Sequence, residues 1–171
     1  MGSSVPEEIP VLANVEVSQS PEEKFREYLS SRPRAQRYTG QQRDMVRFIF
    51  SKHNHFDADQ LVDEMKDAGF QVSRATIYRT LSKLVDAGLL RHLELGPRMF
   101  YEHVYGYPQH DHMHCTDCHK VIEFQHPSME NVIQEVCQKE HFKMDGHSFI
   151  VRGICVDCNR KKMTKRRLDL V

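Results

Sequence analysis

Hydrophobic residues recur at helical spacing through the first half of the chain, with residues that begin or end helices between the runs. In one of these runs, the apolar residues stand at i, i+3, i+4 and i+7, which are Ala58, Leu61, Val62 and Met65. The pattern predicts four helices: from Pro21 to about Ser31, from Thr39 to the polar break at residues 52–54, from Asp57 to near Gly69, and from Ser73 to Gly88. The third and fourth are short and joined by a tight turn, which predicts a helix-turn-helix.

Two strand-like runs follow at once, residues 89–95 and 98–103, and Gly96-Pro97 between them predicts a β-hairpin. A helix-turn-helix followed by a hairpin is a winged helix. Further on, short runs at 121–124 and 148–154 flank one amphipathic helix that begins near Pro127. The predicted fold class is therefore α+β, with a winged helix-turn-helix domain followed by a small α+β domain.

These patterns give four regions. We expect a flexible tail over residues 1–20, a winged-helix DNA-binding domain over 21–103, a metal-binding dimerisation domain over 104–159 and a basic C-terminal tail over 160–171.

Charge separates the two predicted domains, although the 24 basic and 24 acidic residues of the whole chain cancel. Residues 21–102 hold 14 Lys/Arg against 12 Asp/Glu, whereas 104–159 hold 4 against 8 and seven of the eleven histidines. A mildly basic module suits phosphate, and carboxylates with imidazoles suit divalent cations. The chain has no apolar run long enough to span a bilayer and no signal-peptide pattern at its start, so we expect a cytoplasmic protein without a membrane partner.

Four of the five cysteines form two C-x-x-C pairs, which predict a structural zinc site in the second domain. Each two-residue gap lets both thiolates of a pair reach one ion, and two pairs complete a tetrahedron with no open position. Redox-active thiols are the alternative interpretation of such pairs. The predicted zinc ligands are Cys115, Cys118, Cys155 and Cys158.

A His-Asp-His segment lies directly before the first of these pairs. In an extended strand, His110 and His112 point to the same side and can share one ion, whereas Asp111 points to the other side. A solvated polar segment without metal is the alternative.

The fourth predicted helix carries a polar face suited to a DNA groove, although such a face can also be merely solvated. We expect its first half to enter the major groove, with arginine and tyrosine reaching bases or phosphates. The predicted DNA-binding residues are Arg43, Ser73, Arg74, Thr76, Tyr78, Arg79, Lys83 and Arg98.

Two other classes of protein compete with a DNA-binding regulator. A zinc hydrolase could use the His/Asp/Glu cluster to activate water, but the deaminase signature H-x-E…P-C-x-x-C is missing, as are HExxH and a nucleophile elbow. We therefore expect no enzyme activity, no catalytic residues and no organic substrate. A metal-buffering module is the second alternative, but it leaves Tyr78, Arg79 and the wing unexplained.

Three segments, ATIYRTLSKLVDAGLL, HDHMHCTDCHKVIEF and GHSFIVRGICVDC, resemble the ferric uptake regulator family in content and order. The resemblance covers about residues 21–159. It implies a homodimer that binds double-stranded operator DNA and represses metal-uptake genes when a regulatory metal is bound.

The resemblance also implies two further metal sites. The regulatory hinge site corresponds to His55, Glu102, His110, His112 and Glu123, and a second site corresponds to Asp111, Glu130 and His147. This second site departs from the family pattern, because Gln109, a weak ligand, stands where many relatives have a histidine. Oxygen and nitrogen ligands suit Fe(II), the expected co-repressor, but also Mn(II) and Zn(II). A peroxide-, zinc- or manganese-sensing regulator of the same family is the alternative.

Overall fold

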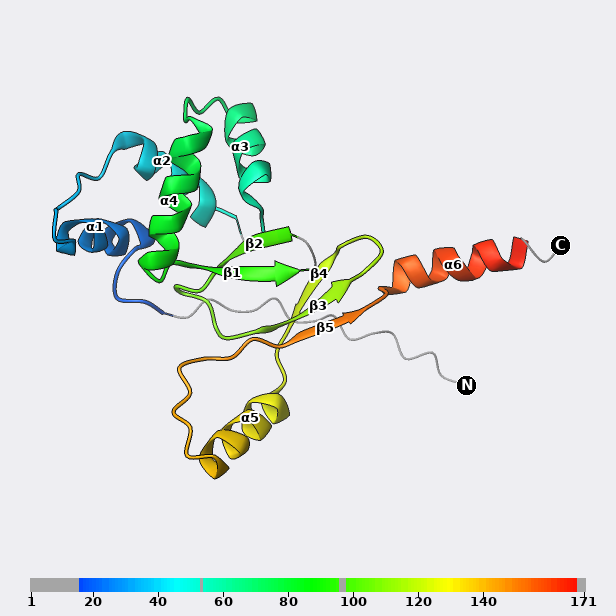
Figure 1. The fold of residues 1–171 in the computed structure, drawn as a ribbon. Helices are drawn as coiled ribbons and strands as arrows, with labels where there is room; N and C mark the ends of the chain where they lie inside the picture. The colour runs from blue at the N-terminus through cyan, green and yellow to red at the C-terminus, as the bar shows by residue number, and fades with distance from the viewer. Residues whose placement is uncertain (1–15, 53, 96–97, 169–171) are drawn as a thin grey trace. The chain divides into compact units, whose positions relative to one another are not determined.

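The computed structural model describes residues 16–52, 54–95 and 98–168 (Figure 1). The chain divides into two compact units between Pro108 and Gln109. The sequence placed the boundary earlier, after His103. Residues 1–15 of the predicted N-terminal tail lie outside the described residues.

The first unit contains a helical part and a two-stranded sheet. Its elements are α1 (Pro21–Ser31), α2 (Gly40–Phe50), α3 (Ala58–Asp67), α4 (Arg74–Asp86), β1 (Leu90–Leu95) and β2 (Arg98–His103). Strands β1 and β2 pair antiparallel. This order of helices and strands confirms the predicted winged helix-turn-helix architecture.

Side-chain caps fix where the helices begin. Ser20 and Thr39 form capping boxes with Glu23 and Gln42, so each cap satisfies two backbone N–H groups that a helix start leaves open. Asp57 and Ser73 cap α3 and α4 in a similar way, each accepting a single hydrogen bond from a backbone N–H group.

Two glycines end α3 and α4. Gly69 and Gly88 have φ of 84° and 64°, in the left-handed region that glycine adopts without strain. The residue after each glycine donates its backbone N–H to a carbonyl five residues earlier, at Met65 and Leu84. These hydrogen bonds close the last helical turns and send the chain into the loop and the wing.

One apolar core lies among the helices and the start of the hairpin. It consists of Phe25, Leu29, Met45, Val46, Ile49, Phe56, Ala58, Leu61, Met65, Ile77, Leu81, Leu84, Leu89, Leu90 and Tyr101, each below a tenth exposed. Because α4 contributes Ile77, Leu81 and Leu84 to this core, its opposite, polar side is held outward.

The second unit is a three-stranded sheet with two helices. Its elements are β3 (Asp111–Cys115), β4 (Val121–Phe124), α5 (Pro127–Lys139), β5 (Ile150–Gly153) and α6 (Val156–Leu168). The strand order is β4-β3-β5, with β3 antiparallel to β4 and parallel to β5. The predicted α+β fold class is confirmed.

Two features of the second unit were not predicted. The basic tail at 160–171 is helical as far as Leu168, because it continues a helix that starts beside the second cysteine pair. The apolar side chains of α5 are not covered: Val132 and Val136 are 57% and 56% exposed. Within the described residues, the longest helices are too short and too polar to cross a bilayer.

Candidate metal centres and nucleic-acid interface

The four cysteines of the two C-x-x-C pairs converge at one end of the second sheet. Cys115 ends β3, and the chain then turns through His119, whose φ is 60° and whose N–H donates to the Cys115 carbonyl. Strand β5 lies beside β3 and delivers Cys155 next to this turn, where its backbone N–H donates to Cys115 Sγ over 3.3 Å. The pairing of β3 with β5 thus brings together two cysteine pairs that lie far apart in the sequence.

The geometry of this four-cysteine cluster fits zinc. All four sulfur atoms lie within 4.8 Å of one another, and Cys118 Sγ lies 3.7 Å from Cys155 Sγ. Zn–S bonds of about 2.3 Å in a tetrahedron require sulfur–sulfur distances of about 3.8 Å. None of the five cysteines is in a disulfide. The predicted cluster is present, and Cys137 takes no part in it.

Backbone N–H groups stabilise the thiolate form of Cys115. The N–H groups of Cys118 and then of Cys155 hydrogen-bond its sulfur and lower the pKa of the Cys115 thiol to about 6. Cys158 sits among the other sulfurs, and their hydrogen bonds raise its pKa to about 12. The deprotonation of one thiol therefore hinders that of its neighbour, and a dication removes this conflict because it stabilises all four thiolates at once.

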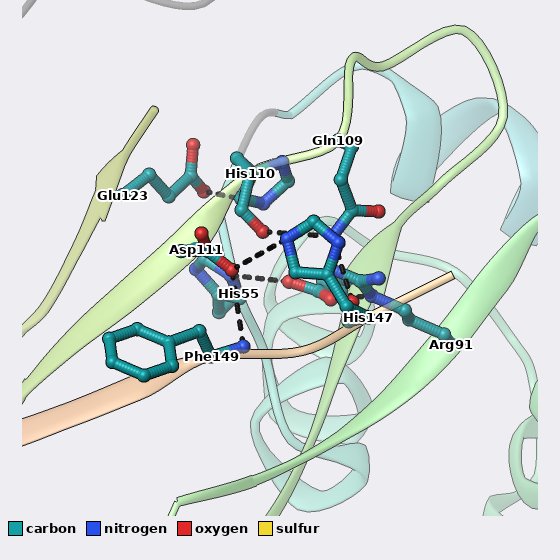
Figure 2. A network of polar contacts seen from close by, with 9 residues as sticks. His55, Arg91, Gln109, His110, Asp111, Glu123, His147 and Phe149 are labelled. Carbon is teal, nitrogen blue, oxygen red and sulfur yellow. Dashed lines mark hydrogen bonds and ion pairs between the residues drawn. The ribbon is translucent and has the colours of Figure 1, made fainter. Parts of the chain in front are cut away.

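A second group of ligands lies in the first unit, beside the wing. An isolated bridge pairs Phe56 with Tyr101, and this pairing brings the preceding and following residues, His55 and Glu102, together. His55 Nε2 lies 3.0 Å from Glu102 Oε2, and the Arg91 guanidinium hydrogen-bonds the other carboxylate oxygen (Figure 2). Strand register explains the second contact, because Arg91 lies directly opposite Glu102 across the hairpin.

A third group lies on one side of β3 in the second unit. The rings of His110 and His112 face each other at 4.9 Å between centroids, as alternate residues of a strand should. Glu123 lies opposite His112 on β4, and its Oε1 is 3.9 Å from His110 Nε2 (Figure 2). Two imidazoles and one carboxylate thus form a partial set of metal ligands.

Asp111 contacts the segment that leads into β5. Its Oδ1 accepts the backbone N–H of Phe149 over 3.1 Å and lies 3.4 Å from His147 Nε2. Gln109, the residue that departs from the family pattern, donates its Nε2–H to the His147 carbonyl over 2.9 Å. Glu130 is exposed on α5 and accepts from Gln134, and the described residues do not bring it within ligand distance of the other two.

The polar side of α4 carries most of the predicted DNA-binding residues. Arg79 is exposed, and the tyrosine at the centre of the face, Tyr78, is 40% exposed. The Ser73 side chain caps the helix and also contacts the Thr76 hydroxyl. Lys83 Nζ donates a hydrogen bond to the Gln36 side chain over 2.6 Å.

Two further predicted contacts lie outside α4. Arg43 on α2 lies 3.6 Å from Asp44. The side chain of Arg98 lies outside the described residues.

Asp59 on α3 organises this face and was not predicted. Its Oδ1 accepts from the Arg74 guanidinium and, over 2.5 Å, from the Tyr78 hydroxyl. The hydrogen bond to Asp59 raises the pKa of Tyr78. Arg91 was also missed, although a basic residue opposite an acidic one in a predicted hairpin could have identified it.

Comparison with known proteins places this chain beside one family of regulators. The model of the ferric uptake regulator family matches residues 34–152. A ferric uptake regulation protein of Campylobacter upsaliensis is 34% identical over 145 residues, which cover 84% of this chain and 92% of that protein.

Solved structures show the same fold. The Helicobacter pylori ferric uptake regulator, described as having three functional metal binding sites, superimposes with a TM-score of 0.74 at 23% identity, covering 86% of this chain and 97% of that one. The Vibrio cholerae ferric uptake regulator, described as having DNA-binding domains that rearrange, gives 0.62 at 26% identity, covering 70% and 92%.

Proposed function

This chain belongs to the ferric uptake regulator family, and we propose that it is a metal-dependent DNA-binding repressor of metal-uptake genes, with Fe(II) as its co-repressor. The observation that carries the proposal is the division of the nitrogen and oxygen ligands into two incomplete sets. His55 and Glu102 belong to the first unit, and His110, His112 and Glu123 to the second.

One ion shared by both sets explains metal control. Neither set alone offers the four to six ligands that a divalent transition metal takes. An ion bound by both sets stabilises only the arrangement of the units that brings the sets together. Its binding energy then shifts the protein toward that arrangement, which we propose to be the one that binds DNA. Cytoplasmic Fe(II) suits this ligand set, and Mn(II) or Zn(II) are alternative regulators.

The proposed DNA-reading element is α4. Its apolar side is buried in the core, so Tyr78 and Arg79 are presented on a rigid surface. Arg43, Arg74, Lys83 and Arg98 are proposed phosphate contacts.

The four-cysteine cluster offers four thiolates and no open coordination position, which favours a structural zinc over a catalytic one. This supports a regulator rather than a zinc hydrolase.

The second unit is proposed to form a homodimer. Its edge strand β5 and its helix α5 expose apolar side chains, including Val132, Val136 and Val151. An uncovered apolar surface of this kind is typical of a protein–protein interface, and a second copy supplies a surface of the same character.

The test of metal control is fluorescence anisotropy of a labelled operator duplex. Protein stripped with EDTA, but retaining its structural zinc, is titrated anaerobically with Fe(II), Mn(II) or Zn(II). We expect DNA binding only after metal is restored, with the order of metals identifying the co-repressor. Binding of equal strength without added metal contradicts the proposed switch.

Three variants separate the proposed roles. His110→Ala with His112→Ala should abolish the response to metal and retain zinc. Tyr78→Ala with Arg79→Ala should abolish operator binding and leave metal content intact. His141→Asn is the matched control, since it removes an exposed imidazole outside both ligand sets, and asparagine tolerates the φ of 51° at that position.

A further inference from the structure

Helix α6 carries a dense positive charge that metal sensing does not use. Over Val156–Leu168 it contains six lysines and arginines and a single acidic residue, Asp157. The basic side chains at positions 160, 161, 162 and 165 are exposed.

The charge surrounds the helix instead of forming one face. At 100° per residue, the consecutive residues Arg160, Lys161 and Lys162 point in three different directions around the helix axis. Lys161 and Lys165 are four residues apart, a spacing at which like charges repel and destabilise a helix. Met163 is 58% exposed, and among the described residues no helix or strand of the unit packs along α6. Packing within the unit therefore adds little to the stability of α6, and a bound polyanion would reduce the repulsion between its basic side chains.

The start of α6 is nevertheless held in place. The helix begins between Cys155 and Cys158, and the Asn159 N–H donates to the Cys155 carbonyl over 2.9 Å. One turn further on, Lys162 Nζ lies 2.7 Å from Oδ2 of Asp117, which lies in the turn between the first two cysteines. The four-cysteine cluster and this ion pair fix the direction in which α6 leaves the sheet (Figure 1).

We propose that α6 is a second DNA-binding element, which contacts the phosphate backbone without reading bases. Duplex DNA carries one negative charge per about 1.7 Å of its axis, and a helix rises about 1.5 Å per residue, so several cations of α6 can meet phosphates together. A helix that lies on a membrane needs an apolar face beside its basic one, and α6 has none. The inference rests on the proposed DNA-binding function and adds a contact outside the winged helix.

The test uses the zinc-loaded full chain and a triple variant, Arg160→Gln, Lys161→Gln and Lys165→Gln. Lys162 is left in place because it is paired with Asp117. The matched control, Lys120→Gln, Lys139→Gln and Lys143→Gln, removes the same charge from exposed positions of the same unit. Binding to an operator duplex and to a scrambled duplex of equal length is measured from about 50 to 200 mM salt.

Removing up to three phosphate contacts lowers the slope of log affinity against log salt by up to about 2.7, at about 0.9 per contact. Both proteins bind more weakly as salt rises fourfold. The factor by which wild type loses affinity should be up to roughly 40 times larger than the factor for the α6 variant. The α6 variant should also bind both duplexes more weakly by the same factor, and the control should resemble wild type. A slope equal to that of the control overturns the proposal, as does lost binding to phosphatidylserine vesicles with unchanged DNA binding.

The two proposals fail in different ways. If wild type binds DNA equally with and without regulatory metal but the α6 variant has a smaller salt slope, the switch fails and the role of α6 stands. If metal-dependent operator binding is normal in the α6 variant with an unchanged slope, α6 fails and the switch stands. Absence of binding to both duplexes refutes both. Zinc content and far-ultraviolet circular dichroism establish that each variant is folded, and Lys161→Gln with Lys165→Gln replaces the triple variant if that variant is not.

Discussion

Replacing one zinc ligand is expected to unfold the second unit while the first stays folded. In Cys115→Ser the buried end of β3 loses its thiolate, and serine is a poor substitute as a zinc ligand. The four sulfurs join the end of β3 to the start of α6, so the loss of zinc separates two segments that are far apart in the sequence.

The two units differ greatly in what else holds them together. Fifteen buried apolar side chains form the core of the first unit, and at about 1.5–3 kcal/mol each their gross contribution is roughly 20–45 kcal/mol. In the second unit, Cys115 is the one apolar side chain below a tenth exposed among the described residues. A structural zinc site contributes about 10–16 kcal/mol, as much as the whole net stability of a typical domain, about 5–15 kcal/mol. Little stability should remain in the second unit without it.

Amide hydrogen exchange measured by mass spectrometry tests this expectation segment by segment. In Cys115→Ser, peptides from β3, β4 and β5 should exchange at nearly unprotected rates, and peptides from α4 should keep wild-type protection. Cys137→Ser is the matched control, because Cys137 lies outside the cluster. Retained protection of β3 in Cys115→Ser would refute the reasoning, since it would show that something other than zinc holds the sheet.

Three further predictions concern the first unit. Asp59→Asn removes a carboxylate that binds Tyr78 and Arg74 beside the proposed DNA-reading face, so operator affinity in the anisotropy assay should rise by up to about fivefold, the value of an exposed ion pair. Asp63→Asn, also on α3, is the control, and weaker operator binding by Asp59→Asn would mean that Asp59 positions the tyrosine. The Tyr38 hydroxyl is buried and has no hydrogen-bond partner among the described residues, so Tyr38→Phe should raise the free energy of unfolding by about 1 kcal/mol in urea. Burial raises the pKa of Tyr38 to about 12 in the folded state, above its value of about 10 in the unfolded chain. The free energy of unfolding of wild type should therefore fall as pH rises from about 10 to 12, and that of Tyr38→Phe should lack this contribution. Gly88→Ala forces a side chain into the left-handed region and should cost about 1–2 kcal/mol in thermal unfolding, whereas alanine at Gly40, in the first turn of α2, should be neutral or stabilising.

Much of the first unit could be predicted because its signals are local. A capping residue such as Ser73 and a glycine such as Gly88 act within one helical turn, and apolar spacing shows which side is buried. The four-cysteine cluster could be predicted for a different reason. Two C-x-x-C pairs carry their chemistry in their spacing, even though the fold that brings them together depends on long-range strand pairing.

What escaped prediction depends on contacts between elements. Asp59 lies in the first turn of α3, 19 residues before Tyr78, and only the packing of α3 against α4 brings the two side chains together. The apolar spacing of α5 correctly predicted an amphipathic helix, but Val132 and Val136 are exposed in the single chain. Periodicity shows that a face is apolar and does not identify what covers it.

The helical continuation of residues 160–168 escaped prediction for an electrostatic reason. Like charges in a run of this kind favour an extended chain, whereas here the helix is started by the cysteine turn that precedes the run.

The separate stabilisation of the two units limits how metal can control DNA binding. The proposed DNA-reading face of α4 is held outward by Ile77, Leu81 and Leu84, which are buried in a core that contains no metal ligand. In the proposed mechanism, regulatory metal therefore has no need to fold α4, and it acts on the placement of a helix that is already formed. Metal-free protein should accordingly keep full amide protection in α4 while its operator affinity is lost. Loss of that protection on removal of regulatory metal alone would mean that metal acts by folding the helix.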